Sequence, residues 1–240
     1  MDISKITRQG RKLLKLKHCG AVIVAAGSAS RMGGSDKVMA QLGGEPIVLR
    51  AVKAFAQCDA IREIVVVTRP DLIVPIMDLC AGIQKVTAVV AGGSSRPESV
   101  HLGLNALSEK VKLAAIHDGA RPLVTWQLID RVVRAANTYG AAAPAVPVKD
   151  TIKVVQGGVV KETPPRKDLF AVQTPQVFDF DLLRGALKKA ADDGAEITDD
   201  CSAVERMGMS VKIVEGDERN LKITTPLDLA VAKMLLEETQ

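Results

Sequence analysis

Aromatic residues are scarce in this sequence of 240 residues: phenylalanine, tryptophan and tyrosine make up 2% of it, whereas 47% of the residues are hydrophobic. The core must therefore be packed from valine, isoleucine, leucine and alanine, which is typical of parallel strands covered by helices on both faces. The shortage argues against nucleic-acid modules that stack bases on aromatic side chains. A chain of this length can bury the core of a single α/β domain.

Long apolar runs and closely spaced metal ligands are also missing. No apolar stretch approaches the length that spans a bilayer, so the sequence predicts no contact with membranes. The four cysteines are widely scattered, without a Cys-x-x-Cys pair, and no histidine stands at ligand spacing. This pattern argues against a structural zinc site and predicts unpaired thiols in a reducing compartment, here the cytoplasm.

The formal charge of +4 is concentrated at the N-terminus. Residues 1–20 carry six basic side chains against Asp2 alone, whereas the remainder carries 26 basic and 27 acidic ones. The body of the protein is thus nearly neutral, and no nucleic-acid partner is expected. We interpret residues 1–19 as a basic extension, with a targeting role left open, and residues 20–240 as one domain.

The first candidate site is the loop that ends the predicted strand starting at Ala21. Small residues follow Gly27, and two cations, Arg31 and Lys37, come next. Small side chains let backbone N–H groups approach phosphate oxygens, so this loop is predicted to bind a polyphosphate. It is not a P-loop, because Gly-Lys-Ser/Thr is absent, and it is not a dinucleotide fingerprint, because Ala29 stands where glycine is needed. A glycine-rich turn with solvated cations is the simpler alternative.

Two later junctions between a strand and a helix carry polar side chains. In the first, Gly93 can let a base lie on the backbone and Ser99 can donate a hydroxyl hydrogen bond to it. In the second, Asp118 can orient a hydroxyl or help to hold a metal ion, and Arg121 can bind a phosphate with two hydrogen bonds. A helix cap and a structural salt bridge are the simpler alternatives. Right-handed connections would place all three loops at one sheet edge, around one ligand.

Strand and helix patterns alternate along the chain, which is typical of a parallel sheet. After the first strand, strands are predicted over 62–68, 85–91, 112–117, 141–148 and 211–215, and helices over 47–57, 72–81, 125–139, 180–191, from 198–200 to about 207, and from Pro226 onward.

Residues 149–172 interrupt this alternation. Two short strands around Gly157 and Gly158 predict a β-hairpin arm that projects from the α/β body. A hairpin of this size is rarely stable alone, so we expect the arm to pack on a partner subunit, the alternative being a floppy surface hairpin. Beyond the arm, Lys222 follows the last strand and is a third candidate cation for the phosphate site, unless it is simply solvated.

These motifs, taken in order, resemble one family. They are Ala25-Ala26-Gly27, Arg31, Lys37, Gly92-Gly93, Asp118-x-x-Arg121-Pro122, Thr174-Pro175-Gln176, Ile197-Thr198-Asp199 and Asn220-Leu221-Lys222-Ile223-Thr224. The chain is similar to 2-C-methyl-D-erythritol 4-phosphate cytidylyltransferases from about residue 20 to about residue 237. The resemblance implies a mostly parallel, Rossmann-like nucleotidyltransferase sheet with helices on both faces and a dimerisation arm.

The resemblance also implies roles for individual residues. The cytidine nucleotide would be bound by the three loops and Lys222, that is, by Ala25, Ala26, Gly27, Arg31, Lys37, Gly93, Ser99, Asp118, Gly119 and Lys222. The sugar phosphate would be held by Asp118, Arg121, Thr151, Arg166, Thr174 and Thr198. Catalysis would rest on four cations, Arg31, Lys37, Arg166 and Lys222.

The implied reaction joins CTP and 2-C-methyl-D-erythritol 4-phosphate, a polyol phosphate, with release of pyrophosphate. Mg²⁺ would be bound mainly through the triphosphate, and its protein ligands stay unknown. The implied homodimer would form through the arm, so that Thr151 and Arg166 reach the neighbouring subunit's site. The alternatives are cytidylyl transfer to ribitol 5-phosphate and a nucleotide-binding module without turnover.

Overall fold

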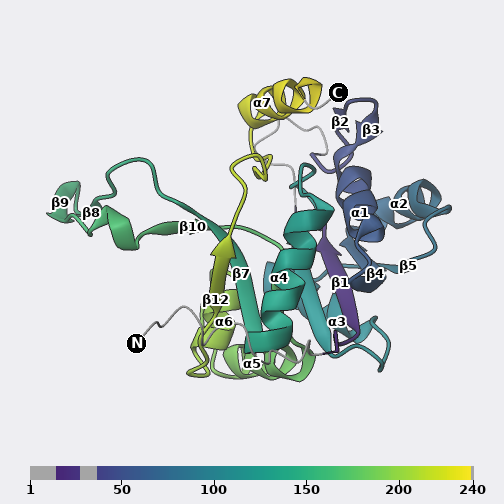
Figure 1. Cartoon of the computed structure of the whole chain (residues 1–240), viewed down its shortest axis with the longest axis horizontal. Helices are drawn as coiled ribbons and strands as arrows, with labels where there is room; N and C mark the ends of the chain where they lie inside the picture. Colours follow the sequence, from purple (N-terminus) through teal and green to yellow (C-terminus); the bar gives the residue numbers. More distant parts are fainter. Residues whose placement is uncertain (1–14, 28–36, 239–240) are drawn as a thin grey trace, which may run out of the picture.

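The computed structural model describes residues 15–27 and 37–238, and it contains an eight-stranded, mainly parallel sheet (Figure 1). Strands β5 (Val86–Ala91), β4 (Ile61–Thr68), β1 (Cys19–Val24) and β6 (Leu113–Asp118) lie side by side in this order and are parallel. Next to β6 comes β11 (Gln176–Asp179), which is antiparallel both to β6 and to β7 (Ala141–Pro147). Strand β7 also pairs with β10 (Phe170–Val172), antiparallel, and with β12 (Lys212–Glu215), parallel.

Helices cover both faces of the sheet, as the sequence predicted. On one face lie α1 (Ile47–Gln57), α2 (Ile73–Cys80) and α4 (Trp126–Tyr139), and on the other α3 (Arg96–Asn105), α5 (Phe180–Asp192) and α6 (Asp200–Glu205). Strand β1 serves both cores, because Ile23 packs into the first cluster and Val22 into the second. This alternation follows from the two-residue period of a strand and explains why the run is apolar throughout.

A smaller apolar cluster joins the C-terminal helix α7 (Pro226–Glu237) to the short strand β2 (Gln41–Leu42), which pairs with β3 (Glu45–Pro46), and to Ile47 at the start of α1. Its buried residues include Leu42, Ile223 and Ala232. Helix α7 begins with a capping box, in which Thr225 accepts from the backbone N–H of Asp228 and Asp228 accepts from that of Thr225. The predicted helix start at Pro226 is confirmed. The cluster ties the segment that carries Lys222 to the region just after Lys37.

Most predicted elements agree with the structure to within one or two residues, and the differences concern the antiparallel part of the sheet. Strands β10 and β11 were not predicted, since residues 169–176 were expected only to return the chain from the arm. Each has at most four residues and is positioned by its neighbours in the sheet: β10 pairs with β7, and β11 pairs with both β6 and β7. The strand predicted over 112–117 extends to Asp118, so this carboxylate belongs to the strand end itself.

The predicted hairpin arm is present. Strands β8 (Val154–Gln156) and β9 (Val159–Glu162) pair antiparallel, and Gly157 and Gly158 have φ values of 58° and 80° in the two-residue turn. Such a turn requires positive φ at both central residues, which glycine adopts without strain. Every residue of both strands is exposed, and the arm projects from the body on the left of Figure 1.

Within the described ranges, none of the helices combines the length and apolar character needed to cross a membrane.

Candidate active site

A cavity of about 380 Å³ opens at the carboxyl ends of β1, β5 and β6. The structure brings most of the predicted nucleotide-binding residues together around it. Those that line it are Ala25, Ala26, Gly27, Lys37, Gly93, Ser99, Asp118 and Lys222, together with Val24, Val38, Ser94, Ser95, Arg96 and Ala120. Arg31 lies outside the described residues. The three loops thus meet at one sheet edge, where an open α/β sheet binds its ligands.

Two glycines let these loops approach one another. A Cβ atom added at Gly92 would lie 2.5 Å from the Cβ atom of Ala26, and one added at Gly119 would lie 3.2 Å from the carbonyl oxygen of Val24. Any larger residue would push the second or the third loop away from the first. Gly119, a predicted nucleotide contact, is not among the lining residues, and the structure places it against the backbone of the first loop.

Asp118 is the centre of a group of charges. Its Oδ2 atom lies 2.9 Å from Nζ of Lys222 and 3.6 Å from Nε of Arg121, and its Oδ1 atom lies 3.5 Å from Nε of Arg96. Burial alone would raise the pKa of this carboxyl, but Lys222, Arg96 and Arg121 together hold it well below its usual value. Asp118 is therefore ionised at any pH at which the protein functions, and it keeps three cations beside the cavity.

Arg121 contacts Asp118 but is not among the residues that line the cavity. Its Nη1 atom donates to the backbone oxygen of Asn220 (2.7 Å), and Asn220 in turn donates from Nδ2 to the backbone oxygen of Thr174 (2.9 Å). Burial lowers the pKa of Arg121, although Asp118 acts in the opposite direction. The Arg121 guanidinium therefore links the loop that carries Lys222 to Asp118 at the end of β6.

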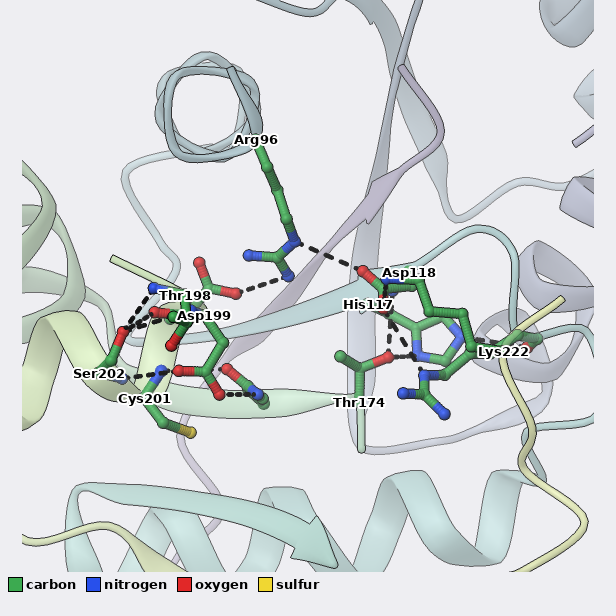
Figure 2. Close-up of polar contacts among 12 residues, drawn as sticks. Arg96, His117, Asp118, Thr174, Thr198, Asp199, Cys201, Ser202 and Lys222 are labelled. Atoms are coloured by element: carbon green, nitrogen blue, oxygen red, sulfur yellow. Dashed lines mark hydrogen bonds and ion pairs between the residues drawn. The ribbon is translucent and has the colours of Figure 1, made fainter. Parts of the chain in front are cut away.

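Thr174, predicted to hold the sugar phosphate, is buried and has its hydroxyl engaged on both sides (Figure 2). The hydroxyl oxygen accepts from the backbone N–H of Asp118 (3.1 Å) and lies 3.0 Å from Nδ1 of His117, whose Nε2 atom lies 3.2 Å from the carbonyl oxygen of Arg121. A carbonyl only accepts, so the neutral tautomer with hydrogen on Nε2 satisfies this network, and Thr174 then donates to Nδ1. Burial lowers the pKa of His117 to about 4, which keeps the ring neutral.

Ser99 has its hydroxyl engaged inside the second loop. Its Oγ atom donates to the backbone oxygen of Ser95 (2.9 Å) and accepts from the backbone N–H of Gly93 (3.1 Å). The expectation was that this hydroxyl donates to a base. In the structure the proton points at Ser95 instead, so the residue shapes the loop on which a base can lie.

Three predicted substrate-binding residues lie away from this cavity. Thr198 is exposed in the turn before α6, where its backbone N–H donates to Oγ of Ser202 (3.2 Å). Thr151 and Arg166 are exposed on the arm, and Arg166 donates from Nη1 to the backbone oxygen of Lys149 (2.9 Å). None of the three lines the cavity of its own chain.

Sequence reasoning assigned no role to Arg96, which lines the cavity and forms ion pairs with Asp118 and Asp200. It also missed the buried His117 and Asn220. The position of Arg96 directly after Gly92-Gly93-Ser94-Ser95 was the available signal, because the first residue of a helix after a ligand-binding loop lies beside the ligand.

Comparison with known proteins agrees with this geometry. A family model described as IspD: 2-C-methyl-D-erythritol 4-phosphate cytidylyltransferase matches residues 19–238. A 2-C-methyl-D-erythritol 4-phosphate cytidylyltransferase from Caldanaerobacter subterraneus subsp. tengcongensis is 45% identical over 92% of this chain and 100% of its own length. One from Geobacillus kaustophilus is 45% identical over 90% of this chain and 96% of its own length.

Solved structures give the same answer. The 4-diphosphocytidyl-2C-methyl-D-erythritol synthase of Anaerococcus prevotii superposes with a TM-score of 0.84 at 30% identity, over 92% of this chain and 99% of that one. The 2-C-methyl-D-erythritol 4-phosphate cytidylyltransferase of Thermus thermophilus superposes with a TM-score of 0.75 at 34% identity, over 90% and 98%. The chain belongs to the 2-C-methyl-D-erythritol 4-phosphate cytidylyltransferase family.

Proposed function

We propose that the cavity between β1, β5 and β6 is the site where this enzyme transfers a cytidylyl group from CTP to 2-C-methyl-D-erythritol 4-phosphate. The products are 4-diphosphocytidyl-2-C-methyl-D-erythritol and pyrophosphate. Membership of the family makes the chain a CTP-dependent cytidylyltransferase. The observation that carries the assignment of the site is that Lys37, Lys222 and Asp118 line one cavity, beside the backbone of three loops.

The charges of the cavity suit a polyanion. Lys37, Arg96 and Lys222 line it against one carboxylate, Asp118, which leaves an excess of positive charge for a triphosphate. Lys37 lies close to the first loop, since a Cβ atom added at Gly27 would be 3.7 Å from its Nζ atom. We assign Ala25, Ala26 and Gly27 to the phosphates together with Arg31 and Lys37, and the loop of Gly93 and Ser99 to the nucleoside. Gly119 would support this arrangement by allowing close contact with the backbone of the first loop.

The reaction needs no general base. The acceptor phosphate has a second pKa of about 6, so it is largely a dianion near neutral pH and can attack the α-phosphorus of CTP directly. The protein then has two tasks, to align two polyanions and to stabilise the negative charge that grows as pyrophosphate leaves. Lys37, Lys222 and Arg31 are the cations assigned to the second task.

The acceptor half of the site is assigned to residues from two subunits. Asp118, Arg121, Thr174 and Thr198 would belong to one subunit, with Arg121 and Thr174 acting through the loop and the strand end that they hold. Thr151 and Arg166 would come from the arm of the other subunit of a homodimer. Both arm residues are exposed in this chain and do not line its own cavity, which supports a role toward a neighbour.

Magnesium fits the donor set. In the part of the chain that the structure describes, no group of three or more acidic, histidine or cysteine side chains is arranged to hold a metal ion, and Asp118 is the acidic residue lining the cavity. Mg²⁺ is commonly bound by one or two carboxylates together with substrate phosphates and water. Asp118 would hold the ion with the triphosphate, and the ion would neutralise phosphate charge.

The proposed organisation is one nucleotidyltransferase domain over residues 20–240, preceded by a basic extension over 1–19. The four cysteines are unpaired and buried, which supports a reducing compartment, and we propose the cytoplasm.

One assay tests the proposed function: release of pyrophosphate from CTP with each of the two polyol phosphates as acceptor. We expect rapid release with 2-C-methyl-D-erythritol 4-phosphate and little with ribitol 5-phosphate. Faster release with ribitol 5-phosphate would overturn the acceptor. A module that only binds nucleotide would release pyrophosphate with neither, and in such a module Arg31→Ala and Lys222→Ala would lower only CTP affinity.

A further inference from the structure

Two of the three guanidinium nitrogens of Arg96 contact carboxylates. Arg96 is the first residue of α3, after the N-cap Ser95, and its Nη2 atom lies 2.9 Å from Oδ2 of Asp200. Its Nε atom makes the longer contact of 3.5 Å with Asp118. The third nitrogen, Nη1, forms no hydrogen bond or ion pair with any residue in the described ranges, and Figure 2 shows it pointing away from Asp118. The cavity wall therefore contains a fixed cationic group with two unused N–H donors on Nη1.

Among the described residues, the side chain of Asp200 has no structural role besides its contact with Arg96. Asp200 begins α6, but that helix is capped by Asp199, whose side chain accepts from the backbone N–H of Ser202 (2.9 Å). The Asp200 carboxylate is buried, with a side chain 1% exposed, and its contact with Arg96 is the one interaction that its oxygens make among the described residues. Arg96 is the cation that compensates its charge.

A buried ion pair of this kind contributes little net stability, because desolvation of both charges offsets their attraction. It does restrict the guanidinium, whose planar fork has a fixed geometry once one edge is bound. Without Asp200, the nearest carboxylate for Arg96 would be Asp118, which already pairs with Lys222 at 2.9 Å. Arg96 would then move toward Asp118 and away from the position that it now holds.

We propose that Asp200 is a positioning residue, which holds Arg96 so that Nη1 donates a hydrogen bond to an oxygen acceptor of bound CTP. This inference rests on the proposed function, since it assumes that the cavity binds CTP. Arg96 contacts the ligand, whereas Asp200 acts only through Arg96. The acceptor is a nucleoside oxygen or a phosphate oxygen, and the same chemistry serves for both.

The test is a double-mutant cycle on the affinity for CTP, measured by titration calorimetry with the full-length protein. Asp200→Asn keeps the shape of the side chain and removes its charge. We expect it to weaken CTP binding about tenfold, and Arg96→Met to weaken it tenfold or more, as for loss of a hydrogen bond from a charged donor. In the Arg96→Met background, Asp200→Asn is expected to have no further effect.

Asp199→Asn is the matched control. It makes the same chemical change one residue away, retains a good helix cap, and is expected to leave CTP affinity unchanged. Thermal unfolding of each variant reports on the fold. Since Arg96→Met leaves a buried carboxylate unpaired, Arg96→Lys serves as a second variant: its single ammonium can pair with Asp200 but cannot also reach the nucleotide, so it should bind as weakly as Arg96→Met.

Three results would separate the hypotheses. Failure of the wild-type protein to bind CTP overturns the proposed function itself. Wild-type affinity in Asp200→Asn, or an equal loss from this change with and without Arg96, overturns only the positioning role. Titration with cytidine identifies the acceptor: a tenfold loss with cytidine as well as CTP assigns it to the nucleoside, and a loss confined to CTP assigns it to the phosphates, both in agreement with the proposal.

Discussion

The cavity and the arm are built in opposite ways. At the cavity, buried polar groups interact with their own chain: His117 is inaccessible to solvent, and Asp118 lies within reach of three cations. On the arm, every strand residue is exposed, including the apolar Val155, Val159 and Val160. The charged groups around Asp118 find their partners within one chain, whereas the arm exposes apolar side chains, and exposed apolar patches are common at interaction sites.

Under the proposed function, the two regions would have different tasks. A rigid, buried frame suits groups that must be aligned with a triphosphate, because alignment depends on side chains that cannot move. An exposed hairpin suits a contact that forms only on assembly. The comparison predicts that changes at the cavity alter chemistry or folding within one chain, while changes on the arm act through association.

The largest effect is expected at Lys222. Lys222→Ala removes the cation nearest to Asp118 and should lower kcat by about 10²- to 10³-fold, the usual cost of losing one group that stabilises charge in the transition state. The fold should persist, because Arg96 and Arg121 still compensate Asp118. Steady-state pyrophosphate release gives the rate and titration calorimetry gives the CTP affinity. Lys212→Ala, which removes an ammonium from the ring of Tyr139, is the control. Equal losses of rate and affinity would contradict the assignment.

The next effect is a pH dependence of folding that comes from His117. Its pKa is about 4 in the folded protein and about 6.5 in an unfolded chain, so the unfolded chain binds the proton more tightly. The contribution of neutral His117 to the free energy of unfolding is fully present above pH 6.5, and it is lost as the pH falls through 4. Urea unfolding without nucleotide or magnesium should show stability about 2 kcal/mol lower at pH 5 than at pH 7 from this group.

Two variants isolate the histidine. His117→Gln should flatten the slope between pH 7 and pH 5, whereas His101→Gln, on the half-buried face of α3, should leave it unchanged. An unchanged slope in His117→Gln would show that the ring is not held neutral by burial.

On the arm, a charge introduced by mutation is expected to disrupt the association of subunits. Val160→Asp places a carboxylate on an exposed apolar position, and we expect it to yield monomers and to lower activity about tenfold or more through loss of an interface contact. Light scattering after gel filtration gives the oligomeric state. Val74→Asp, at a comparably exposed valine on α2, is the control and should change neither property. Full activity of a monomeric Val160→Asp would mean that the hairpin is only a surface feature.

The smallest effects compare two glycines. A Cβ atom at Gly103 would lie 2.4 Å from Cγ1 of Val22, so Gly103→Ala should push α3 from the sheet and cost about 1 kcal/mol or more. At Gly158, φ is +80° and no atom lies within 4 Å, so Gly158→Ala strains only the turn, at about 1 kcal/mol. Calorimetric unfolding should show a lower midpoint for Gly103→Ala alone. A similar drop for Gly158→Ala would mean that the arm and body unfold together.

Much of this architecture could be predicted from local signals. The apolar strand before Ala25, the glycines at 92, 93, 157 and 158, and Pro226 at a helix start each act within a few residues, so the sequence predicts their elements directly. The meeting of three loops at one edge could be predicted because right-handed connections leave few other arrangements.

Other features depend on residues far apart in the chain. Arg96 and Asp200 are separated by about a hundred positions, and the sequence around either residue does not predict that they form an ion pair. Strand β11 is too short to show its direction, which is imposed by the two strands that flank it. For His117, the sequence shows a histidine at a strand end, but the tautomer follows from Thr174 and Arg121.

The sequence by itself determined the family, the alternation of strands and helices, and which loops carry charged residues. These features depend on residues that are close together in the chain and on the order of the motifs. The tertiary structure decided which charges pair: Asp118 with Lys222 and two arginines, and Asp200 with Arg96. The reason is that burial makes an unpaired charge costly, and only the packed fold determines which opposite charge is within reach.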